Sequence, residues 1–161
     1  MLTPRCVLLA SHGTAGARAA DETALTLCTP GAVLYHLTVV PDLWKGMMGD
    51  DWLNNASTRA DFGRHVESEL AREIEEHRRS LHPRFDARGV QYVVETRLGK
   101  PARCLIEFAS GIVPDMVLMG SPRPKGEPGL HSRMEMEPLL RSLRSPLLIV
   151  PHPATRSSRW R

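Results

Sequence analysis

Five short segments of the chain are apolar and end at glycine, proline or turn residues. They span residues 6–10, 32–40, 90–94, 116–119 and 146–150. The fourth and fifth contain no polar alternation, which is typical of strands covered on both faces of a parallel sheet. Segments with helical periodicity separate the five. This alternation predicts a single open, doubly wound, Rossmann-like α/β sheet of five parallel strands and four helices.

Four segments are predicted to be helices, and capping residues and prolines indicate where some of them begin or end. A helix should follow the first strand to about Leu27, with Ala17, Ala20 and Ala24 against the sheet and with Asp21 and Glu22 as ordinary helix charges. A long helix is predicted from Ser57 to about Leu81, and another begins at Pro101. Ser132 and Glu135 form a capping box for the last helix. Pro138 indicates either a kink in that helix or a later start.

Charge and cysteine usage narrow the class of protein. Arg156, Arg159 and Arg161 account for the whole formal net charge of +3, so the body of the chain is nearly neutral and no nucleic-acid partner is expected. The three cysteines are widely spaced, as in a reduced cytoplasmic protein.

No apolar run is long enough for a membrane span. We expect a soluble domain over residues 1–153 and a disordered basic tail over 154–161. The Trp44–Trp52 loop is an arm packed on its own domain, a lid or a dimer arm.

The elements and the segments between them resemble the universal stress protein family over nearly the whole chain. The resemblance rests on the first strand with its Gly-containing turn, Tyr35-His36-Leu37, Gly99-Lys100-Pro101-Ala102, Asp115–Ser121 and Ser145–Val150. It implies the strand order 3-2-1-4-5 and a homodimer in which the last strands pair and cover a sheet edge. It also implies a regulatory role in a stress response, with a partner that the sequence leaves unknown.

The glycines that hold ATP in this family are changed here. ATP-binding members carry Gly-x-x-Gly, nine residues, then Gly-Ser or Gly-Thr after strand four, so that main-chain N–H groups surround the phosphates. With Gly120 as the first glycine, the second falls on Arg123 and the final pair on Arg133-Met134. The Asp that ends strand one in those members is replaced by His12.

Prolines reduce the number of donors in the same loop. Pro122, Pro124 and Pro128 have no backbone N–H. Gly126 and Gly129 restore the Gly-x-x-Gly spacing, but the next glycine that the motif requires is absent. We therefore predict a non-enzymatic binding protein without a glycine-loop cofactor, and ATP or another anionic nucleotide remains as an alternative ligand.

The candidate ligand site lies at the carboxyl ends of the strands, where open α/β sheets bind their ligands. It consists of Ser11, His12, Gly13, Leu37, Met119, Gly120, Ser121, Arg123, Lys125, Gly126 and Arg133. Arg123, Lys125 and Arg133 could hold a nucleotide or another anion through their side chains. The competing interpretation is a solvated basic loop.

His12 supports a third hypothesis, a metal-dependent or acid–base enzyme. His-Gly-Thr after an apolar strand is similar to the start of small cobalt- or iron-chelatase proteins, in which a histidine near that point binds metal. No second histidine stands at an interpretable spacing, because His36 is expected in the middle of a strand. No catalytic residue and no metal ligand is therefore assigned.

Overall fold

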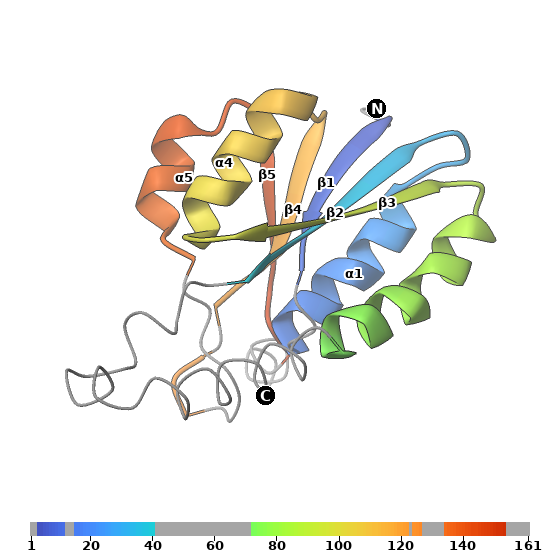
Figure 1. Ribbon diagram of the computed structural model, residues 1–161, viewed down its shortest axis with the longest axis horizontal. Helices are drawn as coiled ribbons and strands as arrows, with labels where there is room; N and C mark the ends of the chain where they lie inside the picture. The colour runs from blue at the N-terminus through green and yellow to red at the C-terminus, as the bar shows by residue number, and fades with distance from the viewer. Residues whose placement is uncertain (1–2, 12–14, 41–71, 123, 127–133, 154–161) are drawn as a thin grey trace, which may run out of the picture.

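Five parallel strands form one sheet in the order β3-β2-β1-β4-β5, as predicted. The computed structural model describes residues 3–11, 15–40, 72–122, 124–126 and 134–153. The strands are β1 (Cys6–Ala10), β2 (Val33–Val40), β3 (Gln91–Leu98), β4 (Met116–Gly120) and β5 (Leu147–Val150). The central strand, β1, pairs with β2 on one side and β4 on the other (Figure 1).

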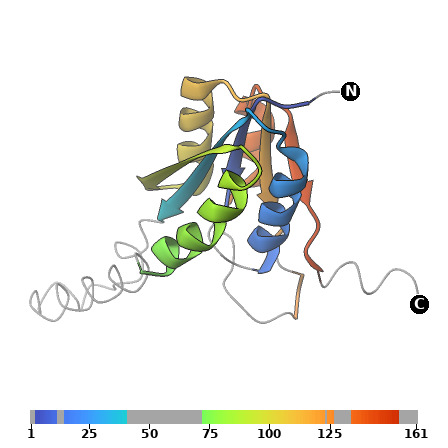
Figure 2. The same cartoon turned by 90° about the vertical axis from the view of Figure 1, so that its right-hand side faces the viewer.

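Helices cover both faces of the sheet. On one face lie α1 (Ala15–Leu27) and a helix over residues 72–86, called here the 72–86 helix. On the other face lie α4 (Pro101–Ile112) and α5 (Met136–Ser142), as Figures 1 and 2 show. The described residues thus have the four helices and the doubly wound architecture that the sequence predicts.

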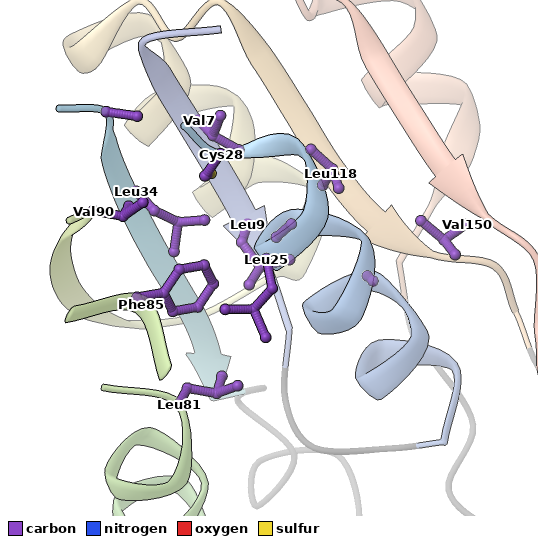
Figure 3. Close-up of a cluster of buried hydrophobic side chains, with 13 residues drawn as sticks. Val7, Leu9, Leu25, Cys28, Leu34, Leu81, Phe85, Val90, Leu118 and Val150 are labelled. Atoms are coloured by element: carbon purple, nitrogen blue, oxygen red, sulfur yellow. The ribbon is translucent and has the colours of Figure 1, made fainter. Parts of the chain in front are cut away.

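The sheet separates two apolar cores, and β1 contributes to both. Val7 and Leu9 pack on the face covered by α1, together with Phe85 of the 72–86 helix (Figure 3). Leu8 points to the opposite core, which contains Leu105 of α4. All of these side chains are fully buried. A strand covered on both faces favours apolar side chains at every position, which explains the unbroken apolar run of β1.

Two elements extend beyond their predicted ends. β3 continues to Leu98 instead of stopping at Val94, because its last residues pair with β2 up to Val40. The 72–86 helix passes Leu81, where its end was predicted. One turn further, Phe85 is fully buried against the sheet, and this burial favours continuation of the helix. The predicted part of this helix from residue 57 to residue 71 lies outside the described residues.

The last helix begins later than the capping box predicts. α5 starts at Met136, and the side chain of Glu135 before it makes no capping hydrogen bond. Pro138 then lies in the first turn, where a missing N–H removes no intrahelical bond. Of the two outcomes that Pro138 indicated, the later start is confirmed.

Some predictions fall on parts of the chain that the structure does not describe. These are the Trp44–Trp52 loop and the tail over 154–161. Within the described ranges, no helix combines the length and the apolar character needed to cross a bilayer.

Candidate functional site

The carboxyl ends of β1, β2 and β4 lie side by side at one edge of the sheet. Ala10, the last residue of β1, is in register with Leu37 of β2 and with Met119 of β4. Leu37 and Met119 are almost completely buried. The structure therefore places these two predicted site residues on either side of Ala10. Because their side chains are buried, they offer little surface to a ligand.

Gly120 ends β4 against the first turn of α1. A Cβ atom at this position would lie 2.3 Å from the carbonyl oxygen of Gly16, well inside van der Waals contact. The close approach of α1 to the sheet therefore requires glycine at position 120. Packing alone accounts for this residue, whether or not a phosphate binds nearby.

Ser121 uses its polar groups within the protein. Its N–H donates to the Val150 carbonyl at 2.8 Å, and its Oγ accepts from the His152 N–H at 2.8 Å. Pro122 and Pro124 follow and have no N–H to donate. Three successive described positions of the loop therefore have no free main-chain donor for an anion.

The rest of the predicted loop is described only in part. Lys125 is exposed, and Gly126 follows it in a turn with φ of 90°, a conformation that favours glycine. His12, Gly13, Arg123 and Arg133 lie outside the described residues. Their placement in the candidate site stays a prediction.

A buried histidine, which the sequence analysis did not assign to the site, holds the end of β1. His36 is fully buried in β2. Its Nε2 lies 2.9 Å from the Ser11 carbonyl oxygen, and its Nδ1 lies 2.5 Å from the Tyr92 hydroxyl. A carbonyl only accepts, so Nε2 carries the proton and Nδ1 accepts the O–H of Tyr92. Thr38 also donates to the Ser11 carbonyl, at 3.3 Å, and the backbone that leads to residue 12 is held by these bonds.

Burial determines the charge of this network. It lowers the pKa of His36 to about 4, so the ring is neutral near pH 7. It also raises the pKa of the Tyr92 hydroxyl far above its usual range. The network is therefore an uncharged, hydrogen-bonded support and has no group ready to exchange a proton near neutral pH.

A second polar cluster joins the two helices on the same face. Asp21 of α1, with a side chain only 3% exposed, places Oδ2 at 3.1 Å from His77 Nε2 of the 72–86 helix. Ser11 Oγ lies 3.4 Å from the same nitrogen. The prediction that Asp21 is an ordinary helix charge is therefore wrong, whereas Glu22 is exposed as predicted.

This cluster has the residue types of a hydrolase triad but not its geometry. In a triad the acid binds one ring nitrogen and the nucleophile binds the other. Here Ser11 and Asp21 both approach Nε2 of His77, and Ser11 is 3% exposed. The cluster fastens the 72–86 helix to α1 and to the end of β1; it does not activate a nucleophile.

The cysteines do not provide an activated nucleophile either. Burial raises the pKa of Cys28 to about 11, and it also raises the pKa values of Cys6 and Cys104. A raised pKa keeps a thiol protonated and weakly nucleophilic. In the described part of the chain, no three histidine, cysteine or acidic side chains are grouped so that they could hold a metal ion.

A sequence signal for both clusters exists in hindsight. Asp21 lies on the same helical stripe as Ala17, Ala20 and Ala24, which pack on the sheet. His36 stands within an apolar strand. A polar residue at a core position needs hydrogen-bond partners inside the protein. The positions of Asp21 and His36 in the sequence therefore indicate that each takes part in a buried hydrogen-bond network.

The family profile described as the Universal stress protein family matches residues 5–151. Among curated proteins, none matches this sequence significantly. The family match covers every described strand and helix.

Solved structures share the arrangement at low sequence identity. The hypothetical protein MJ0577 is 16% identical with a TM-score of 0.72, covering 93% of this chain and 97% of that chain. The universal stress protein UspA from Lactobacillus plantarum is 14% identical with a TM-score of 0.65, covering 93% and 99%. A universal stress protein family protein from Arabidopsis thaliana, solved with AMP bound, is 14% identical with a TM-score of 0.63, covering 97% of each chain. At these identities, what is shared is the fold.

Proposed function

Because the chain belongs to the universal stress protein family, we propose that it is a non-enzymatic binding protein that acts in the cytoplasm, as a homodimer, in the regulation of a stress response. The carboxyl-edge site of this protein does not hold ATP through main-chain amides. Its regulatory ligand or partner is recognised in another way.

The observation that carries this proposal is that residues 121, 122 and 124, among the described residues after β4, have no free main-chain N–H. The Ser121 N–H is already bonded to the Val150 carbonyl, and Pro122 and Pro124 have no N–H. A main-chain phosphate site depends on successive N–H groups that point at the anion. Gly120, the one family glycine retained at the start of the loop, is required by its contact with Gly16.

The absence of catalytic activity is supported by the chemistry of the described polar side chains and cysteines. Ser11 and Asp21 share one nitrogen of His77, His36 is locked as a neutral ring by Ser11 and Tyr92, and burial raises the pKa of each cysteine. Each of these groups is used for structure.

Calorimetry with ATP and Mg²⁺ tests the proposal. We expect no binding at about 10 µM or tighter, an affinity that corresponds to about 7 kcal/mol. Tighter binding, together with a structure in which main-chain amides of residues 120–134 contact the phosphates, would contradict the proposal. Mass spectrometry of small molecules that copurify with the protein would identify a different ligand directly.

Side-chain recognition of an anionic nucleotide is the second candidate function. Lys125 is exposed at a turn in this loop, and a relative from Arabidopsis thaliana binds AMP. In this mode Arg123, Lys125 and Arg133 replace the glycine amides. The double variant Arg123→Ala, Arg133→Ala should abolish AMP binding, while Arg103→Ala, an exposed position on α4, should leave it unchanged. Equal affinity in all three proteins would exclude this mode.

A further inference from the structure

The groove between α1 and the 72–86 helix is charged where neighbouring helices usually pack apolar side chains. Both helices bury their apolar sides on the sheet, through residues such as Ala24 and Phe85. Toward each other they present polar side chains around a pocket of about 600 Å³. Among the described residues that line it, only Leu81 is apolar. The two helices stand side by side on this face in Figures 1 and 2.

The pocket carries more negative than positive charge. Its carboxylates are those of Asp21, Glu22, Glu73 and Glu76, and its guanidinium groups are those of Arg18 and Arg84. Arg84 binds Glu22 through two hydrogen bonds of 2.6 and 2.9 Å, so this pair neutralises itself. Among the described lining residues, three carboxylates and one guanidinium remain, an arrangement that favours a cation in the pocket.

One of these carboxylates is buried and incompletely bonded. Asp21 has a side chain 3% exposed, and its Oδ2 faces His77 at 3.1 Å. Its other oxygen, Oδ1, is buried without a hydrogen-bond partner. A buried acceptor left without a donor is costly, so a donor that enters through the pocket would gain a strong, charge-assisted hydrogen bond. Oδ1 exposes almost no surface, so a ligand could reach it only if exposed side chains of the pocket wall changed rotamer.

The arrangement suits an extended organic cation better than a metal ion. Among the described residues, no three potential ligands converge on one point, as a divalent cation would require. Asp21 stands on α1, whereas Glu73 and Glu76 stand on the opposite wall. Separated carboxylates can each pair with a different amine of one ligand, and the volume lies within the range of small-molecule sites.

We propose that the pocket between α1 and the 72–86 helix is a binding site for an aliphatic di- or polyamine, with one ammonium group donating to Asp21 Oδ1 and another pairing with Glu73 and Glu76. This pocket adjoins the carboxyl-edge site, because Ser11 Oγ lies 3.4 Å from His77 Nε2, but the described residues that line it are not those assigned to the carboxyl-edge site. Amine binding needs no nucleotide, and its test does not depend on whether the carboxyl edge binds one.

Titration calorimetry of the full chain with spermidine and putrescine at low ionic strength tests this proposal. We expect saturable binding of spermidine that weakens with added salt. The double variant Glu73→Gln, Glu76→Gln should weaken it by roughly three- to tenfold, as expected for the loss of exposed ion pairs, and Asp21→Asn should abolish it. Glu107→Gln removes an exposed carboxylate that pairs with Arg103 on α4, on the other face of the sheet, and should leave the affinity unchanged.

Three results would overturn the proposal. They are no saturable heat with spermidine, equal weakening by Glu107→Gln and by the Glu73/Glu76 double variant, or displacement of spermidine by an equal concentration of Mg²⁺. If Asp21→Asn fails to fold by circular dichroism, the double variant decides alone, because Glu73 and Glu76 are exposed and their replacement leaves the core intact.

Discussion

At the scale of single residues, His36 is the clearest case of a buried polar group that the fold cannot lose cheaply. Replacing it with leucine leaves the Tyr92 hydroxyl without its partner and removes one of two donors to the Ser11 carbonyl. We expect His36→Leu to lower the free energy of unfolding by about 2–4 kcal/mol, measured by urea denaturation.

Tyr92→Phe provides the matched control for this prediction. It removes the hydroxyl that donates to His36 Nδ1 and keeps the aromatic ring that stacks on Phe85. Its cost should be smaller, about 1 kcal/mol. Equal losses in the two variants would mean that the bond from His36 to the Ser11 carbonyl contributes nothing.

His36 also predicts how stability changes with pH. Burial lowers its pKa in the folded protein to about 4, whereas an exposed histidine has a pKa of about 6.5. Between these values the unfolded chain binds a proton that the folded protein does not, so acid favours unfolding. Stability should be complete above about pH 6.5 and should fall by up to about 3 kcal/mol toward pH 4. Urea denaturation at a series of pH values measures the slope.

The variant His36→Gln isolates this effect, because glutamine does not titrate. Asp21, His77 and Arg78 face the same ring from α1 and from the 72–86 helix and remain in the variant. The pH dependence of its stability should be shallower by up to one proton between pH 4 and 6.5. A slope identical to that of the unchanged protein would assign the titration to another group.

The limits of sequence reasoning are clearest at this scale. Ser11 was predicted in the ligand site from its place after an apolar strand. The structure places it directly after β1, and its role in a ligand site stays a prediction. Its contact with His77, 66 residues away, depends on how the 72–86 helix lies across the sheet. The periodicity of a strand or helix predicts which of its faces is buried. It does not predict how a neighbouring helix is rotated about its own axis, so the contact between Ser11 and His77 could not be predicted.

At the scale of elements, the contact between α1 and β4 depends on Gly120. An added methyl group would meet the Gly16 carbonyl at 2.3 Å and the Ala17 nitrogen at 2.9 Å. Both are backbone atoms that move only if the helix moves. We expect Gly120→Ala to lower the free energy of unfolding by about 2 kcal/mol or more, measured by urea denaturation.

Gly111→Ala is the control for this substitution. Gly111 lies in α4, and a methyl group there would have nothing within 4 Å. Since alanine favours helix over glycine by roughly 1 kcal/mol, this variant should be as stable as the unchanged protein or more stable. A neutral Gly120→Ala would show that α1 can shift away from β4, and the glycine would then need a functional explanation.

The presence of each strand and helix was predicted better than the residues at which it ends, because tertiary contacts determine the ends. The polar residues Glu95, Thr96 and Arg97 made β3 look shorter than it is, but an edge strand tolerates polar side chains while its backbone still pairs with β2. The long helix was likewise predicted to end near Leu81, but it continues past Pro83, and Phe85 is buried in its last turn. Tertiary contacts decided both ends.

At the scale of the whole molecule, the layered arrangement followed from the sequence because each strand and helix carries its own signal. Apolar runs such as Met116–Met119 require cover on both faces, and helices between parallel strands supply it. The order of strands came from the family resemblance and agrees with the structure. The interhelical pocket had no such signal, since its charged walls looked like ordinary solvated helix faces.

The sheet has two edges, and we expect only one of them to form the homodimer. β5 is an edge strand that leaves Leu148 and Ile149 more than one third exposed. Pairing of β5 with a second copy would bury these side chains and its free backbone groups. The unchanged protein should therefore sediment as a dimer, and Ile149→Lys should sediment as a monomer in analytical ultracentrifugation.

The opposite edge supplies the control for this experiment. Val94 on β3 is 42% exposed, so Val94→Lys places the same charge on an equally accessible edge strand. It should remain dimeric, because the predicted interface lies on the other side of the sheet. A monomeric unchanged protein, or an Ile149→Lys variant that stays dimeric while Val94→Lys dissociates, would remove β5 as the interface. The second result would place the interface on β3.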